Sequence, residues 1–267
     1  MKRIKRMAIF IAAVLMFHMP AYAINNMQSV ANGAYLQCLG IFYGNENGLS
    51  LNKQLTRVEA TTIALRMSGV ESEAKAYQGD MPFWDVPDWA NNYIAYSYNA
   101  GVIYGVSAEL FASQEIITLN QFAAMLLRCI GYKDGVDFEY KNAYKLAYDI
   151  GAMKYLAYDG KMKRADAADI CAGFLETKMK NSDMTLYEDL VSRGIVSASD
   201  ILIANYTREN SLLQGSDVEY DNDIGSLERL MNENELNEEE EKLHTEEENQ
   251  ELDKPVVPEP EPDTGEE

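Results

Sequence analysis

The chain has 267 residues, a formal net charge of −20 and two histidines, His18 and His244. An acidic chain without a basic stripe is unsuited to nucleic acid, because such binding depends on neutralising phosphates. The central part of the chain has no histidine, which excludes Ser-His-Asp and Cys-His catalysis there and also His-based zinc sites. We therefore expect no enzyme chemistry of these classes and no cofactor.

The first 23 residues have the features of a secretory signal peptide. Basic residues occupy four of positions 2–6, residues 7–17 are apolar, and residues 21–23 (AYA) form a small-x-small cleavage site. The apolar stretch is much shorter than the roughly 20 residues that span a bilayer. We expect the segment to be removed, so that the mature protein leaves the cytoplasm without stable membrane insertion; a retained anchor is the alternative.

Residues 24–205 are expected to form one helical body, in which three segments repeat a helix, a glycine-containing loop and a second helix. The segments cover about 24–72, 80–133 and 134–179. In the central segment Pro87 suits a first helical turn, with Trp89, Tyr93 and Ile94 on an apolar face, and Gly101 ends the helix as a left-handed cap.

The second helix of each segment begins at a recognisable cap. Thr56 with Glu59 and Thr118 with Gln121 are spaced as capping boxes, whereas the third segment has Lys163 at the cap position. Behind these caps runs a shared apolar stripe with spacings of three and four residues, which predicts one buried face. Its members are Ile63, Met67 and Val70, then Met125, Cys129 and Tyr132, then Ile170 and Phe174.

The three cysteines, Cys38, Cys129 and Cys171, show no Cys-x-x-Cys pairing. Cys129 and Cys171 fall at core positions of the repeat, so we interpret them as small buried apolar residues. A disulfide between two chains through Cys38 stays open as an alternative.

Beyond the third segment, residues 182–204 are expected to add a closing helix. Residues 206–267 read as an acidic tail, because residues 217–267 hold 21 acidic residues against three basic ones. Such a composition cannot bury enough apolar surface to fold, so we expect a solvated, disordered spacer. An interaction tail and a cation sponge are the alternatives. The body between signal and tail is only mildly acidic.

Arg57 and Arg164 stand at the first position of their helices, where the helix dipole disfavours a cation by about 0.3–1 kcal/mol. Helix stability therefore does not explain these residues. An anionic partner would, because helix N-terminal N–H groups and a guanidinium can hold a carboxylate together. An intramolecular pair with a nearby Asp or Glu explains them equally well. The central segment has Leu119 at this position.

The central segment resembles the surface-layer homology (SLH) module, which ties exported bacterial proteins to the cell wall. The residues that carry the resemblance are Phe83-x-Asp85-Val86-Pro87-x-Trp89-Ala90, Tyr93-Ile94, Gly101-x-x-x-Gly105, Phe111 and Ile117-Thr118. Residues 38–44 (CLGIFYG) echo residues 99–105 (NAGVIYG), and residues 149–153 repeat the same helix ending. Residues 55–60 (LTRVEA) and 162–167 (MKRADA) are similar to the family signature Ile-Thr-Arg-Ala-Glu.

This resemblance implies an all-α body of three SLH repeats with pseudo-threefold, three-lobed symmetry, at the wall or surface of a bacterium. It also implies binding of an anionic secondary cell-wall polysaccharide, such as one with a pyruvylated sugar, whose carboxylate meets Arg57 and Arg164. Asp85 and Trp89 match the family's loop-and-helix motif; Trp89 would stack on a sugar or lie in the core. Gly101 and Gly105 would bring the backbone close to the groove or serve only as turns.

Departures from the family pattern keep a second function open. The central segment lacks the signature arginine, and the first and third lack the Phe-x-Asp-Val-Pro-x-Trp opening. The alternative is a degenerate SLH scaffold that docks envelope proteins without glycan affinity. A glycosidase that uses paired carboxylates such as Asp85 and Asp88 is a third, weaker reading.

Overall fold

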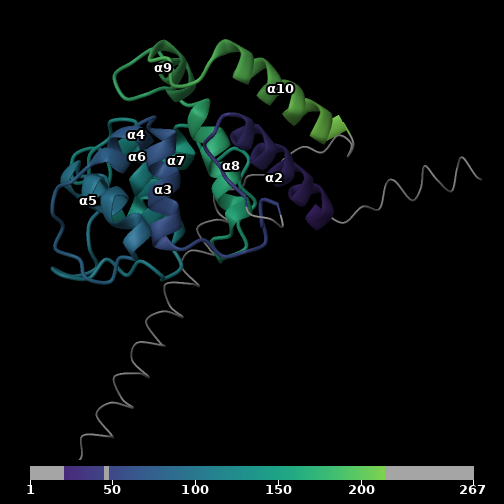
Figure 1. Ribbon diagram of the computed structural model, residues 1–267. Helices are drawn as coiled ribbons and strands as arrows, with labels where there is room; N and C mark the ends of the chain where they lie inside the picture. Colours follow the sequence, from purple (N-terminus) through teal and green to yellow (C-terminus); the bar gives the residue numbers. More distant parts are fainter. Residues whose placement is uncertain (1–20, 45–47, 214–267) are drawn as a thin grey trace, which may run out of the picture. The chain divides into compact units, whose positions relative to one another are not determined.

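The computed structural model describes residues 21–44 and 48–213, and this part is all-α, as the sequence predicts (Figure 1). The expected signal peptide lies outside the described residues except for residues 21–23, which begin a helix, and the expected tail lies outside them from residue 214. The helices are α2 Ala21–Cys38, α3 Arg57–Met67, α4 Glu71–Ala76, α5 Asn91–Asn99, α6 Leu119–Cys129, α7 Ala143–Asp149, α8 Arg164–Leu175, α9 Leu186–Ser192 and α10 Ala198–Leu213, with 3-10 turns η1 Asp88–Ala90 and η2 Tyr140–Asn142.

The helix boundaries follow local chemistry. Thr56 and Glu59 form a capping box, in which the Thr56 N–H donates to Glu59 Oε2 at 3.0 Å, and Thr118 and Gln121 form another. At the start of α8 the Lys163 N–H donates to the side chain of Asp166 at 2.7 Å. Two segment loops follow a left-handed glycine at the end of α2 or α5, Gly40 at φ 70° and Gly101 at φ 71°.

Two expectations about helices differ from the structure. The segment after Pro87 forms the short turn η1 before α5, and Trp89 in this turn is 56% exposed instead of contributing to an apolar face with the buried Ile94. The expected closing helix over residues 182–204 is two helices, α9 and α10, and α10 continues to Leu213, past the expected end of the body at residue 205.

Backbone hydrogen bonds join the loops that precede α3, α6 and α8. The Leu55 N–H donates to Met162 O at 3.1 Å, and the Ile117 N–H donates to Leu55 O at 2.9 Å. These three side chains are at most 1% exposed, so the loops meet at the core. The Arg57 and Arg164 N–H groups each donate to a loop of another segment, at Glu115 O and Lys53 O. The N-terminus of each of these two helices is thereby fixed against a neighbouring segment.

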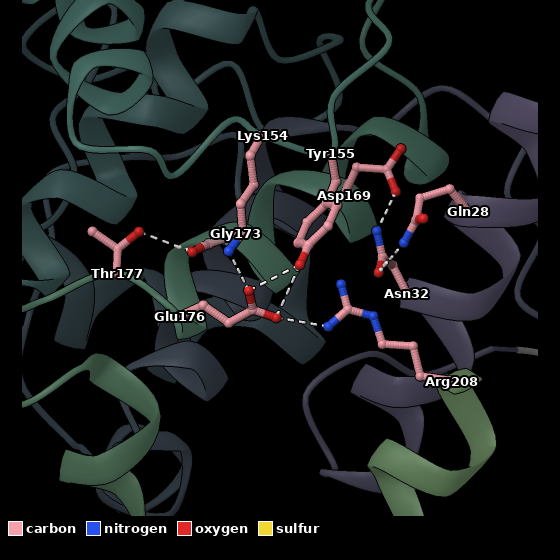
Figure 2. A network of polar contacts seen from close by, with 9 residues as sticks. All are labelled: Gln28, Asn32, Lys154, Tyr155, Asp169, Gly173, Glu176, Thr177 and Arg208. Atoms are coloured by element: carbon pink, nitrogen blue, oxygen red, sulfur yellow. Dashed lines mark hydrogen bonds and ion pairs between the residues drawn. The ribbon is translucent and has the colours of Figure 1, made fainter. Parts of the chain in front are cut away.

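Helix α2 packs against both α8 and α10 (Figure 1). Its Ser29 hydroxyl and Asn32 amide donate to the two carboxylate oxygens of Asp169 on α8, at 2.6 and 2.7 Å. On α10, Arg208 reaches Glu176 at the end of α8, at 2.7 Å (Figure 2). Helices α2, α8 and α10 are therefore tied together by buried or half-buried polar contacts.

All three cysteines are free thiols. Cys171 is fully buried, as predicted, and Cys129 is half-buried with its Sγ 3.7 Å from Ala64 O. Burial raises the pKa of the Cys129 thiol to about 11, which makes it a weak nucleophile. The Cys38 Sγ lies 3.8 Å from the hydroxyl of Thr207 on α10.

Candidate functional site

A cleft of about 550 Å³ lies where α3, α6 and the loop after α5 meet. Its lining comes from all three segments, and its volume falls within the range of small-molecule sites. The lining residues are Arg57, Tyr104, Gly105, Val106, Gln121, Met125, Arg128, Asp134 and Tyr140. Tyr104 and Tyr140 are 56% and 45% exposed, so their rings offer open aromatic surface in this cleft.

Arg57 forms the cationic end of the cleft. Its Nε–H donates to Phe111 O at 3.0 Å and one Nη2–H to Tyr104 O at 3.2 Å, while the guanidinium carbon lies 4.7 Å from the centre of the Phe111 ring. These bonds use two of the five guanidinium donors. Burial lowers the pKa of Arg57, yet an arginine stays charged at any physiological pH. Among the described residues, Arg57 has no carboxylate within ion-pair distance.

Asp85 supports the loop that holds Arg57. Its carboxylate accepts the N–H groups of Phe111 and Ser113, both at 2.8 Å, on either side of Ala112, whose φ is 60°. Burial alone would raise the pKa of Asp85, but these backbone bonds outweigh it and the pKa is lowered. The carboxylate therefore stays ionised, fixes the loop and so positions Phe111 O for Arg57.

Arg128 occupies the other end of the cleft in a different electrostatic state. Its Nε and Nη2 donate to the two oxygens of Asp134 at 2.7 and 3.1 Å, and its Nη1 donates to Val102 O at 2.8 Å. The guanidinium carbon lies 4.8 Å from the centre of the Tyr104 ring. This end is thus neutralised by a direct ion pair, whereas Arg57 has only the Glu115 and Asp85 carboxylates at longer range.

Arg164 repeats the arrangement of Arg57 at a second, smaller cleft of about 200 Å³. Its Nε–H donates to Leu49 O at 2.9 Å and its Nη2–H to Tyr43 O at 2.6 Å, and its guanidinium carbon lies 4.5 Å from the Phe42 ring centre. Burial lowers the pKa of Arg164 as well. Glu59 and Lys53 line this cleft too, but they pair with each other at 3.1 Å.

Three of the six predicted site residues line a cleft, and the other three do not. Arg57 and Gly105 line the larger cleft, and Arg164 lines the smaller one. Asp85 acts on the loop, and the exposed Trp89 lies outside both linings, which corrects its alternative placement in the core. Gly101 ends α5 at φ 71° with open space around it, as a turn residue does.

Gly105 is needed by packing. A Cβ there would lie 2.4 Å from Ser107 O and 2.5 Å from the Phe83 ring. Any side chain would therefore displace the loop that carries Tyr104.

Seven of the cleft residues were not predicted as site residues, and four of these are charged or aromatic: Tyr104, Arg128, Asp134 and Tyr140. The internal repeat points to two of them, Arg128 and Tyr104, and to neither Asp134 nor Tyr140. Arg66 and Arg128 fall at equivalent positions one residue before Met67 and Cys129, and Tyr43 and Tyr104 are equivalent in the echo of residues 38–44 by 99–105.

The described residues contain neither a metal-binding cluster nor a membrane-spanning helix. There, no group of three or more His, Cys, Asp or Glu side chains is arranged to hold a metal ion. No helix in this part of the chain has the length and apolarity needed to cross a bilayer.

The chain is similar to proteins of the bacterial cell surface. It is 31% identical over 199 residues to a cell surface protein of Thermoanaerobacter kivui, covering 71% of this chain and 26% of that protein. It is 28% identical over 111 residues to a middle cell wall protein of Brevibacillus brevis, covering 40% and 10%. A surface layer protein of Brevibacillus choshinensis is 29% identical over 104 residues, covering 38% and 9%. The chain is a cell-surface or cell-wall protein.

These matches cover a part of each relative. The chain spans about a quarter of the first relative and about a tenth of the other two. A shorter stretch of 78 residues is 37% identical to part of an endoglucanase of a Bacillus species, covering 29% of this chain and 8% of that protein. No family model matches the chain.

Proposed function

We propose that this chain is an exported, non-enzymatic cell-envelope protein whose three SLH repeats bind an anionic secondary cell-wall polysaccharide. Cleavage after residue 23 would release it to the surface. Relatives named for the cell surface, the cell wall and the surface layer support the location and a structural role without catalysis. The match to an endoglucanase covers too little of that protein to argue for hydrolysis.

The observation that carries the proposal is that Arg57 lines an open cleft without an ion-pair partner among the described residues, since Glu115 and Asp85 act on its charge only from beyond ion-pair distance. A buried cation without an anion costs free energy unless a partner supplies the charge. Backbone carbonyls orient Arg57, but they do not neutralise it, and three of its donors are left for a ligand. An acidic sugar fits this cleft, because its carboxylate would pair with Arg57 while its ring packs on Tyr140.

The equivalent geometry of Arg164 supports the same conclusion. Two helices from different segments each place an arginine over a phenylalanine ring and onto two loop carbonyls. An intramolecular ion pair, the alternative from the sequence, is not what holds either residue in the described part of the chain. A wall polymer with repeated acidic groups would engage both clefts at once and gain avidity.

Binding to purified walls of the source bacterium tests the proposal. We expect Arg57→Ala with Arg164→Ala to lower affinity at least about tenfold, since one charge-assisted hydrogen bond contributes about 1.5–3 kcal/mol. Arg193→Ala, which removes an exposed cation paired with Asp189, is the matched control. The wild-type chain should bind only weakly to walls whose carboxyl groups have been amidated.

Two results would count against glycan binding. The first is sedimentation of the double variant with walls at the wild-type level while its fold, checked by circular dichroism, is intact. The second is equal binding to native and amidated walls. Binding to walls that keep their proteins, but not to walls stripped of protein, would favour the docking of an envelope protein.

A further inference from the structure

The larger cleft holds two guanidinium groups whose charges are handled differently. Arg57 is oriented by carbonyl groups, whereas Arg128 is matched by the carboxylate of Asp134 through two hydrogen bonds. The Arg128 side chain is 9% exposed, and that of Asp134 is 29% exposed. Asp134 therefore presents part of its carboxylate to the cleft, while the pair carries no net charge.

We propose that Asp134, Arg128 and Tyr104 form a subsite for an uncharged sugar, adjacent to the acidic sugar that Arg57 binds. This inference rests on the proposed function, and it assigns the ligand as an acidic sugar linked to a neutral one. A second anion is disfavoured at this end, because the Asp134 carboxylate would face it. Sugar hydroxyls are favoured, because a carboxylate accepts about four hydrogen bonds and Arg128 uses two of these sites.

Tyr104 provides the apolar contact that a sugar ring requires. Its ring is 56% exposed and is held under the Arg128 guanidinium at 4.8 Å, so its orientation is fixed before any ligand binds. Its carbonyl oxygen accepts a hydrogen bond from Arg57. One residue thus connects the charged end of the cleft with the compensated end, which places two adjacent ligand groups at a set spacing.

The same combination occurs beside Arg164. Arg66 lies 4.3 Å from the centre of the Tyr43 ring and pairs with Glu71 at 2.9 Å, and the Tyr43 carbonyl binds Arg164. Tyr43 lines both the Arg164 cleft and a neighbouring cleft of about 360 Å³ that contains Arg66 and Glu71. Among the described residues, a tyrosine between an arginine without an ion-pair partner and an arginine with one therefore appears at both predicted sites.

A purely structural role for the pair makes a different prediction. Arg128 also holds Val102 O, so the pair could serve only to fix the loop after α5 to α6. In that case Asp134→Asn would lower stability, and truncating the exposed Tyr104 ring would leave wall binding intact. In the subsite, both changes weaken binding.

The test measures binding of the full chain to purified walls at about 0.05 M and about 0.5 M salt. Salt screens the contact of Arg57 with an acid but hardly affects hydrogen bonds to neutral hydroxyls. We expect Tyr104→Ala to lower affinity about tenfold, by the same factor at both salt concentrations. Asp134→Asn leaves the Arg128 cation unpaired, and this added charge attracts an acidic polymer more strongly at low salt. Its loss of affinity should therefore reach about tenfold at high salt and be smaller at low salt. Arg57→Gln should cause a larger loss at low salt than at high salt. Asp189→Asn on α9, which breaks an exposed Arg–Asp pair, is the control and should bind like wild type.

The outcomes separate the two proposals. If the wild-type chain does not bind walls, the proposed function fails and the subsite falls with it. If Arg57→Gln weakens binding while Tyr104→Ala and Asp134→Asn match the Asp189→Asn control, only the subsite is overturned. If Asp134→Asn does not fold, Tyr104→Ala decides alone, because its backbone contact with Arg57 is retained.

Discussion

Arg57 is buried and Arg208 is mostly buried, and both stack on aromatic rings, but their surroundings differ. Arg208 pairs with Glu176 at 2.7 Å (Figure 2). Its guanidinium carbon lies 5.1 and 4.5 Å from the ring centres of Tyr35 and Tyr155. Glu176 also contacts Lys154 and accepts the Tyr155 hydroxyl. Arg57 is held by carbonyl oxygens beside an open cleft.

The pKa values follow this difference. Burial lowers the pKa of both arginines, but the hydrogen bond with Glu176 and the nearby Tyr155 outweigh it at Arg208, whose pKa is raised overall. The pKa of Arg57 is lowered. Burial alone thus does not separate a structural arginine from a binding one. A carboxylate within ion-pair distance separates the two, and Glu176 supplies one for Arg208.

The largest effect is expected when the ion pairs of Glu176 with Arg208 and Lys154 are removed. Glu176→Gln removes the anion shared by Arg208 and Lys154, leaving a mostly buried cation without a partner, so we expect a loss of about 2–3 kcal/mol in the free energy of unfolding. Urea unfolding checks it. Arg57→Gln should cost less than half as much, and a larger loss for Arg57→Gln would reverse the assignment of roles.

A second prediction concerns Asp169, whose buried carboxylate accepts from the neutral groups of Ser29 and Asn32. Burial raises its pKa to about 8, although these two bonds lower it; Asp166 raises it further and Arg208 lowers it. The folded chain therefore keeps a proton that the unfolded chain releases near pH 4. Stability contributed by this group is greatest below about pH 4, falls as the pH rises to about 8, and is constant above that.

Asp169→Asn should remove most of this slope and make the fold more stable than wild type at pH 8, because the unfolded variant has no carboxyl at this position to ionise. Asp166, whose pKa burial raises to about 7, would account for the remaining slope. Thermal unfolding between pH 4 and pH 9 measures both. An unchanged slope in the variant would show that Asp169 is ionised in the folded chain.

A smaller effect is expected at the start of α6. Thr118→Ala removes the hydroxyl that accepts the Gln121 N–H at 3.2 Å, and loss of such a cap costs about 1 kcal/mol. Because α6 carries Arg128, wall binding should fall only through stability. Chemical denaturation and wall binding, measured on the same sample, distinguish an effect through stability from a direct effect on the cleft. A loss of binding without a loss of stability would contradict this interpretation.

The smallest effect is expected at Trp89. It is 56% exposed on η1 and does not line the Arg57 cleft, so Trp89→Ala should change the free energy of unfolding by less than about 0.5 kcal/mol. We also expect unchanged wall binding if binding is confined to the two clefts. A clear drop in affinity with intact stability would extend the binding surface to η1.

The sequence predicted what depends on neighbouring residues. Thr56, Thr118 and Gly101 mark helix ends through contacts within a few positions, so their roles follow from spacing. The first helical positions of Arg57 and Arg164 were predicted for the same reason.

What stayed hidden depends on residues far apart in the chain. The carbonyl partners of Arg57 lie 47 and 54 positions away, and Asp85 acts on Phe111, 26 positions away. No local pattern reveals such contacts. The extension of α10 to Leu213 was missed because its polar sequence resembles the start of the tail, whereas Arg208 and the buried Ala204 anchor it from a distance.

Gly173 on α8 holds the position that Arg66 and Arg128 occupy in the other two segments. A Cβ at Gly173 would lie 2.0 Å from Ala152 O, so the two backbones are too close for any larger residue. An arginine at this position of the third segment would thus require the main chain to separate first, so the third segment cannot carry the arginine of its neighbours at this position without a backbone shift.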